Sequence, residues 1–230
     1  MKVLAVPDIH FPFADPVAIK ALIRFAKQYR PHVVVCLGDE LDLYSLSRYP
    51  RSVSVITPAD EYLQGMNLLR AFWKAMRKAC GRKTKFVTIS SNHVDRLRKR
   101  VLEKLPEVEP YLLKDPFHVD GVKRIEGEII LDGVMYLHGY RGKSVDHAKY
   151  AQMSTVHGHS HQAGLTYLKN VRGPYFAMEC GWLGDETLPV YSYKQQALTT
   201  WNKAWATITD GAPALHLYIP PRRTHRRKSR

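Results

Sequence analysis

The sequence predicts an α/β protein with a parallel sheet in its first half and mainly β-structure in its second half. Over the first hundred residues, short apolar runs rich in β-branched residues alternate with longer amphipathic segments, which is typical of βαβ units. After Pro106 the strand patterns follow one another closely, and Asp-Gly pairs that favour tight hairpins separate two sets of them. An apolar fraction of 45% in 230 residues is enough to bury a core, which excludes a disordered chain.

The first predicted elements are a strand, a helix and a second strand. Lys2–Val6 is largely apolar and ends before Pro7. Asp15 and Pro16 suit the N-cap and the first turn of a helix, and apolar residues recur along one face of the segment that follows. His32–Leu37 is apolar almost throughout, as expected of a strand that is covered on both faces.

The next elements continue the alternation. A second helix is predicted from Thr57-Pro58 to about Lys78, because acidic residues in its first turn are followed by regularly spaced apolar ones. Lys85–Ser90 is the third predicted strand, and Val94–Lys104 is predicted to be a helix with a strongly basic surface.

The second half is predicted to consist mainly of strands. Ile125–Leu131 and Val134–His138 flank Asp132-Gly133, which predicts a two-residue hairpin. The later strand candidates are Thr155–His157, Ala163–Leu168, Tyr175–Glu179, Ala204–Thr209 and Ala214–Ile219. We therefore expect a single domain over residues 1–219 and a basic, flexible tail over residues 220–230, where six cations follow the two prolines.

The composition also bears on location and partners. Lysine and arginine number 35 against 21 acidic residues, a formal net charge of +14. No apolar run reaches the ~20 residues of a membrane-spanning helix, and the first stretch is too short for a signal peptide. We expect a cytoplasmic protein (host cytoplasm if it is phage-encoded) with no membrane partner. Three widely spaced cysteines are expected to be reduced, buried thiols.

Polar side chains follow five of the predicted strands, each at the point where the strand ends. They are Asp8 and His10, then Asp39 and Asp42, then Asn92 and His93, then His138, and last His159 and His161. In extended chain, residues i and i+2 point the same way, so two of these pairs can each act as a two-pronged ligand. Carboxylates, neutral imidazoles and an amide suit divalent manganese, iron or zinc. Seven donors from this set of nine already exceed the needs of one tetrahedral ion and suffice for two ions.

The same residues form five motifs in a fixed order. They are DIH (Asp8–His10), GDELD (Gly38–Asp42), SNH (Ser91–His93), HG (His138-Gly139) and GHSH (Gly158–His161). In these motifs the chain resembles the calcineurin-like metallophosphoesterases, and its short length is similar to that of their small bacterial and bacteriophage members. The resemblance covers roughly residues 1–161. It implies a four-layer α/β/β/α sandwich in which two packed β-sheets are flanked by helices.

The resemblance further implies a centre of two divalent ions, manganese ahead of iron, zinc or nickel. It assigns Asp8, His10 and His161 to the first ion, Asn92, His138 and His159 to the second, and Asp39 to both. A hydroxide that bridges the ions is then the nucleophile that attacks phosphorus. His93 matches the family histidine that protonates or stabilises the leaving oxygen, and Asp42 would support the ligands from behind.

Two departures from the family pattern concern neighbours of these motifs. Val94 stands where an acid commonly follows the histidine, so Asp95 at the next position is the candidate for orienting His93. Leu43 stands where an arginine often follows the second motif. Neither change removes a ligand that the resemblance implies.

The expected function is hydrolysis of a phosphate ester, with a phosphodiester in nucleic acid as the favoured substrate. Cations of the segment from Arg96 to Arg100 follow the SNH motif directly, and a basic face beside such a site would attract polyanions. The alternative interpretation of these cations is an ordinary solvated helix face. In that case the protein is a phosphomonoesterase or a cyclic-nucleotide phosphodiesterase for small molecules. A non-catalytic nucleic-acid-binding protein on the same fold is a third alternative.

The aromatic residues of the last third also allow two interpretations. They are Trp182, Tyr191, Tyr193, Trp201 and Trp205. Such rings stack on nucleic-acid bases in some proteins, but in a β-rich region they more often fill the core, and the core is the favoured interpretation.

Overall fold

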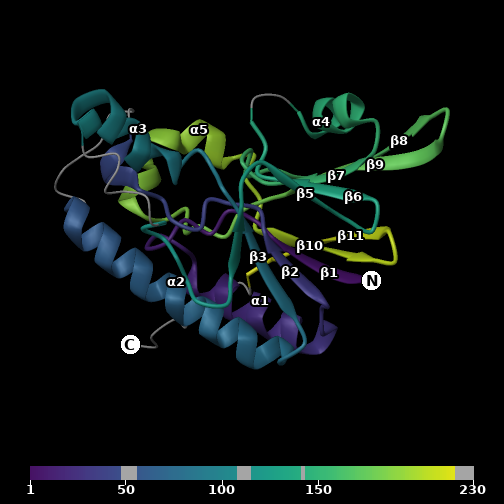
Figure 1. The fold of residues 1–230 in the computed structure, drawn as a ribbon, viewed down its shortest axis with the longest axis horizontal. Helices are drawn as coiled ribbons and strands as arrows, with labels where there is room; N and C mark the ends of the chain where they lie inside the picture. Colours follow the sequence, from purple (N-terminus) through teal and green to yellow (C-terminus); the bar gives the residue numbers. More distant parts are fainter. Residues whose placement is uncertain (48–55, 108–114, 141–142, 221–230) are drawn as a thin grey trace, which may run out of the picture.

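Two β-sheets packed face to face form the centre of the structure, and helices cover their outer faces (Figure 1). The computed structural model describes residues 1–47, 56–107, 115–140 and 143–220. The predicted basic tail, apart from Pro220, lies outside the described residues.

The first sheet has six strands, four of them parallel. In spatial order they are β11 (Ala212–Leu217), β10 (Ala204–Thr209), β1 (Lys2–Val6), β2 (Val33–Cys36), β3 (Lys85–Ile89) and β4 (Lys123–Ile125). β1 to β4 run parallel, and β10 pairs antiparallel with β1, with Val3 opposite Ile208. The C-terminal hairpin therefore completes a sheet that the N-terminal strand begins.

The second sheet has five strands and is also mixed. In spatial order they are β5 (Glu128–Leu131), β6 (Val134–Leu137), β7 (Ser154–His157), β9 (Gly173–Cys180) and β8 (Ala163–Asn170). β6, β7 and β9 run parallel, so β6 and β7 end at the same edge of the sheet. The turn between β5 and β6 is the predicted Asp132-Gly133 hairpin, with both residues in the left-handed region.

Strand β1 shows why the first sheet is apolar on both faces. Val3 and Ala5 pack between the two sheets, whereas Leu4 and Val6 pack against the outer helices, and all four are fully buried. Because successive residues of a strand point to opposite faces, a strand between two cores must be apolar throughout.

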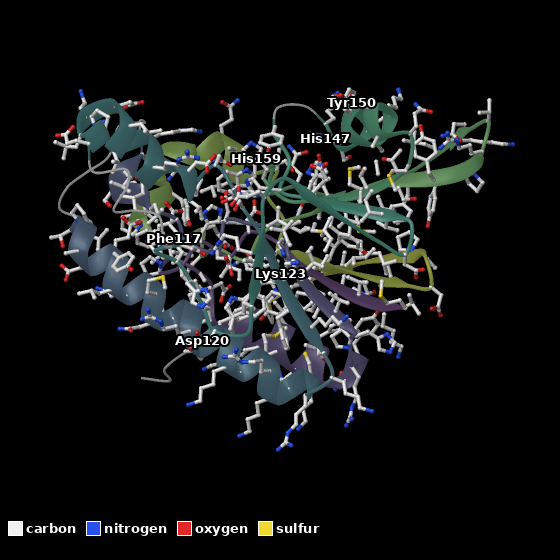
Figure 2. All side chains as sticks on the ribbon, in the orientation of Figure 1. Phe117, Asp120, Lys123, His147, Tyr150 and His159 are labelled. Atoms are coloured by element: carbon white, nitrogen blue, oxygen red, sulfur yellow. The ribbon has the colours of Figure 1, made fainter. Side chains whose placement is uncertain are left out.

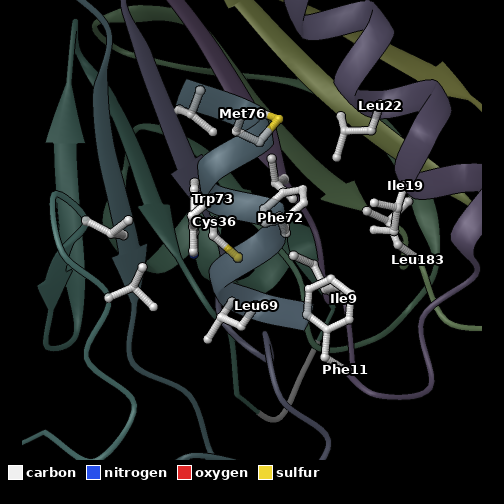
Figure 3. Close-up of a cluster of buried hydrophobic side chains, with 14 of the residues drawn as sticks. Ile9, Phe11, Ile19, Leu22, Cys36, Leu69, Phe72, Trp73, Met76 and Leu183 are labelled. Atoms are coloured by element: carbon white, nitrogen blue, oxygen red, sulfur yellow. The ribbon is translucent and has the colours of Figure 1, made fainter. Parts of the chain in front are cut away.

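Two long helices cover the outer face of the first sheet. α1 (Pro16–Tyr29) begins at Asp15, whose carboxylate accepts the backbone N–H groups of Val17 and Ala18. α2 (Pro58–Cys80) is capped by Thr57 as predicted. Trp73, Phe72 and Leu69 of α2 and Leu22 of α1 belong to the buried cluster that Figure 3 shows.

The remaining helices are shorter. α3 (Asp95–Lys104) follows β3, and α4 (Ser144–Ala151) lies against β7 and β9 on the outer face of the second sheet (Figure 1). The 3₁₀ segments η1 (Tyr44–Leu46) and η3 (Pro189–Lys194) and the short helix α5 (Gln195–Leu198) lie in the connections. With α1 and α2 on one side and α4 on the other, the four-layer α/β/β/α architecture is confirmed.

One predicted strand is wrong. Ile125–Leu131 is not continuous: it contains the end of β4 in the first sheet and all of β5 in the second. The chain crosses between the sheets at Gly127, which has a φ of 78° that residues with a side chain rarely adopt. In the described part of the chain, no helix combines the length and apolar character needed to cross a bilayer.

Candidate metal centre

The candidate ligands meet where the carboxyl ends of the two sheets come together. Asp8, Asp39 and Asn92 follow β1, β2 and β3, and His138 and His159 follow β6 and β7. His159 marks this edge of the sheets in Figure 2. Parallel strands present their C-terminal loops at one edge, so two parallel groups that face each other bring five loops together.

Four of the candidate ligands have a strained backbone. They are His10, Asp39, His159 and His161, with φ values of 60°, 47°, 69° and 61°. The left-handed region is uncommon for residues other than glycine, and such strain collects at functional sites because the surrounding structure holds it in place. The loops therefore adopt an unfavourable backbone conformation that places these side chains at the centre.

Two glycines let the loops approach one another closely. A Cβ at Gly38 would lie 2.8 Å from His138 Nδ1 and equally close to Ser91 Cβ. A Cβ at Gly158 would overlap the carboxylate of Asp8. The glycines of the second and fifth motifs are thus required by contact with the ligands themselves.

The first donor group consists of Asp8, His10, Asp39 and His161, whose ligand atoms all lie within 4.8 Å of one another. His161 Nε2 is 3.2 Å from Asp8 Oδ2 and 2.9 Å from His10 Nε2. All four side chains are buried. This group contains the three residues that the resemblance assigns to the first ion, together with the shared Asp39.

The second donor group consists of Asp39, His138 and His159. His138 Nε2 is 3.5 Å from Asp39 Oδ2 and 3.2 Å from His159 Nδ1. Asn92 Oδ1 lies 2.7 Å from the same His138 nitrogen, so the amide belongs to this group as well. Asp39 is the one residue common to both groups, which is the position that the resemblance gives it.

Hydrogen bonds behind the ligands fix which imidazole nitrogen faces the centre. His10 Nδ1 donates to Asp42 Oδ2 at 2.9 Å, and His138 Nδ1 donates to the Leu37 carbonyl at 2.9 Å. Both acceptors can only accept, so the Nε2 atom of each neutral ring carries a lone pair. Asp42 therefore supports His10 from behind, as the sequence suggested for it.

The unpaired atoms of the cluster fit divalent metal ions. Asp8 Oδ1 and Asp39 Oδ1 are buried and have no hydrogen-bond partner among the described residues. A buried carboxylate is costly unless a positive charge or donors compensate for it. The Nε2 atoms of His10 and His138 lie 3.9 Å and 3.5 Å from Asp39 Oδ2, and this mixture of nitrogen and oxygen donors suits manganese, iron or zinc. An Asp/His cluster suited to divalent metal is thus present.

The protonation states agree with ligand roles. Burial alone raises the pKa of a carboxyl, but nearby imidazoles, His138 foremost, hold the pKa of Asp39 well below its usual range. Burial lowers the pKa values of His159 and His161, which favours the neutral, metal-binding form. His10 differs: although burial opposes it, the hydrogen bond with Asp42 raises its pKa, so metal binding would displace a proton there.

A cavity of about 240 Å³ opens onto the cluster. His93, Arg96, Trp201 and Tyr191 contribute to its wall. The Tyr191 hydroxyl lies 3.3 Å from Asp42 Oδ2, so this aromatic side of the wall also contacts the support of His10. A larger cavity of about 370 Å³ beside α3 contains none of the seven candidate ligands.

The aromatic residues divide between core and cavity. Trp182 and Trp205 are buried, 1% and 6% exposed, as the core interpretation predicts. Trp201 is only partly buried and lines the cavity, where its ring lies edge-on to His161 with centroids 4.2 Å apart. The side chain of Tyr193 lies outside the described residues.

Asp95 does not reach the cluster, and Arg96 contacts His93 in the way that was expected of Asp95. The Asp95 carboxylate is half exposed, lies 3.7 Å from Lys99 Nζ, and lines the larger cavity. Arg96 Nη2 instead donates to His93 Nε2 at 2.5 Å. Sequence spacing could have indicated this: Arg96 follows His93 by three residues, about one helical turn, whereas Asp95 lies on another side of that turn.

Glu40 lies within the second motif but was not predicted to have a role. Its carboxylate is 2% exposed and accepts Trp73 Nε1 at 2.8 Å, Thr88 Oγ1 at 2.7 Å and Arg124 Nη2 at 3.3 Å. The neighbouring Asp39 is therefore attached to a residue that is anchored to α2, β3 and β4.

No protein-family model matches the chain. The gene 54 protein of Mycobacterium phage L5 is 27% identical over 241 residues, which cover 90% of this chain and 88% of that protein. Among solved structures, nuclease MPE of Pseudomonas putida has a TM-score of 0.44 and 14% identity, over 94% of this chain and 87% of that one. The phosphoesterase YfcE of E. coli has a TM-score of 0.38 and 16% identity, over 91% and 88%. A Zn²⁺ complex of Vps29 from Entamoeba histolytica has a TM-score of 0.42 and 10% identity, over 95% and 98%.

The chain resembles the calcineurin-like metallophosphoesterases in three respects that its own residues provide. The five motifs occur in order, each follows a strand, and two packed sheets bring them to one place.

Proposed function

We propose that this chain is a metal-dependent phosphoesterase whose favoured substrate is a phosphodiester in nucleic acid. The observation that carries the proposal is the meeting of the two donor groups at Asp39, beside a cavity that also holds His93 and Arg96.

Two divalent ions fit the donors, with manganese ahead of iron, zinc or nickel because oxygen donors are mixed with imidazoles and thiolates are absent from the groups. One ion would be held by Asp8, His10 and His161, the other by Asn92, His138 and His159, and both by Asp39. When bound, such ions stabilise negative charge on phosphoryl oxygens and lower the pKa of water toward neutrality.

His93 acts in this proposal as a neutral hydrogen-bonding group. Burial lowers its pKa to about 3, although Asp39 opposes the shift. Because its Nε2 accepts from Arg96, the single ring proton is on Nδ1, which has no partner among the described residues. The nitrogen nearest the donor groups is Nε2, 3.6 Å from Asp39 Oδ2, and it carries no proton while it accepts from Arg96, so we assign stabilisation of the leaving oxygen and not full proton transfer to His93.

The basic surface of α3 supports a nucleic-acid substrate. α3 begins three residues after Asn92, and Arg98 and Lys99 are exposed on it. Cations beside a phosphoesterase cavity would attract a polyanion and make its binding dependent on salt.

The test is a substrate panel assayed with Mn²⁺. It contains single- and double-stranded DNA and RNA, chromogenic phosphomonoesters and phosphodiesters, and cyclic nucleotides, with Asp39→Asn as the inactive control. We expect cleavage of nucleic acid that Asp39→Asn abolishes. If only a small ester is hydrolysed, nucleic acid is excluded as the substrate, and the proposal that the chain is a phosphoesterase stands. Salt-sensitive nucleic-acid binding without any turnover would support the non-catalytic alternative.

Deletion of Arg222–Arg230 separates the contribution of the basic tail. We expect the Michaelis constant for polymeric substrates to rise at low salt, with little change for a small ester. Equal changes for both substrates would exclude the tail from substrate binding.

A further inference from the structure

We propose that Arg96 binds the phosphoryl group of the substrate directly through its guanidinium. The five motifs contain no lysine or arginine, and Arg96 supplies that positive charge. The inference rests on the proposed phosphoesterase function and deepens it by naming a substrate contact.

The guanidinium of Arg96 is fixed on the wall of the metal cavity. Its Nη1 donates to the backbone carbonyls of Asp42 at 2.7 Å and Leu43 at 3.3 Å, and its Nη2 donates to His93 Nε2. The side chain is 19% exposed, and the residue lines the cavity together with Asn92. The planar group is therefore held in one orientation while part of it still faces the cavity.

The charge of Arg96 is only partly offset by the protein. The closest carboxylate oxygen among the described ion pairs is Asp42 Oδ1, at 3.9 Å. The other oxygen of Asp42 is already hydrogen-bonded to His10 and lies near the Tyr191 hydroxyl. Arg96 is thus held mainly by neutral acceptors, which position a cation without cancelling it.

A phosphoryl oxygen would supply the missing anion. Arginine has five N–H donors in a rigid fork that matches the geometry of phosphate, and charge-assisted hydrogen bonds of this kind are about twice as strong as neutral ones. Asp8 and Asp39 belong to the donor groups, and Arg96 is the only lysine or arginine among the described residues that line the cavity. An anion that enters the cavity would therefore pair with Arg96. The same contact would stabilise charge on phosphorus-bound oxygens during the reaction.

The matched variants are Arg96→Lys, which retains the charge and loses the fork, and Arg96→Gln, which loses both. Arg24→Gln, at an exposed arginine of α1, is the control for net charge. The measurements on Mn²⁺-loaded protein are metal content, the dissociation constant for inorganic phosphate by calorimetry, and kcat and KM for a small chromogenic ester.

With metal content unchanged, we expect Arg96→Gln to weaken phosphate binding about 10- to 100-fold, the effect of losing charge-assisted hydrogen bonds. Arg96→Lys should fall between wild type and Arg96→Gln, and Arg24→Gln should match wild type. We expect kcat to fall about 10²- to 10³-fold in Arg96→Gln, as for the loss of one donor to a developing oxyanion.

Wild-type phosphate affinity in Arg96→Gln at full metal content would overturn the proposal. A loss of phosphate affinity that only follows a loss of metal in both variants would also overturn it, because Arg96 would then merely position the loop of Asp42. Phosphate binding that depends on Arg96 without turnover of any ester would leave this inference standing and remove the proposed function.

Discussion

Removal of the Glu40 carboxylate tests whether the loop that carries Asp39 is held by a buried charged network. Glu40 is 2% exposed, and Trp73, Thr88 and Arg124 all donate to it. Arg124 keeps a second partner, since its Nε donates to Asp115 Oδ2 at 2.7 Å. Replacing Glu40 therefore breaks the Glu40–Arg124 ion pair, but Asp115 still balances part of the Arg124 charge.

The magnitudes follow from what each variant leaves unpaired. Glu40→Ala leaves two buried donors and part of the Arg124 charge without a partner, and breaking a buried pair in this way costs about 3–5 kcal/mol. Glu40→Gln keeps the shape but turns an acceptor into a donor that faces other donors, which costs about 1.5–3 kcal/mol. For a chain of this size 1 kcal/mol corresponds to about 2–4 °C in melting temperature.

The assay is urea unfolding of metal-free protein followed by circular dichroism, with Glu128→Gln as control because Glu128 is exposed on β5. We expect the control to stay within about 0.5 kcal/mol of wild type. A free energy of unfolding for Glu40→Ala within about 1 kcal/mol of wild type, at unchanged m-value, would refute the idea that this network stabilises the fold.

Three further predictions concern single residues. Gly158→Ala forces a Cβ onto the Asp8 carboxylate, so we expect loss of bound metal together with a loss of stability of about 1–3 kcal/mol, measured by elemental analysis and urea unfolding; wild-type values would contradict the close approach. Asn92→Ala should stay folded and bind one ion per chain in place of two, and wild-type metal content and activity would remove Asn92 from the second donor group. Asp15→Ala should cost about 1–2 kcal/mol because it removes the N-cap of α1. Burial alone would raise the pKa of Asp15, but Lys203 and two backbone N–H groups lower it. The stability that the Asp15 carboxylate contributes is therefore present above its unfolded-state pKa and is lost as the pH falls through its folded-state pKa. An equal effect of Asp15→Ala on stability at pH 7 and pH 2.5 would contradict this.

Local patterns predicted most strands and the first three helices, because their residues carry the pattern themselves. β1 and β10 have the predicted bounds, and Thr57 caps α2 where the sequence placed a helix start. The split of Ile125–Leu131 between two sheets was not predictable in this way, since either half suits a strand and only the packing of the sheets decides which one each joins. α4 was missed because its eight residues carry only a weak apolar face.

The candidate ligands were predictable for a different reason. Each follows a strand, so the topology of a parallel sheet already places them together. The roles of Arg96 and Glu40 could not be predicted, because their contacts depend on how a side chain reaches from one element to another. Arg96 reaches back to the Asp42 and Leu43 carbonyls, and Glu40 reaches α2, β3 and β4 at once.

The most direct test of the metal centre is an anomalous difference map from crystals of Mn²⁺-loaded protein, recorded at the manganese absorption edge. We predict two peaks per chain, both touching Asp39, one of them also contacting His10 and the other His138. A map with no peak in this cavity, or with peaks that Asp39 does not contact, would contradict the account.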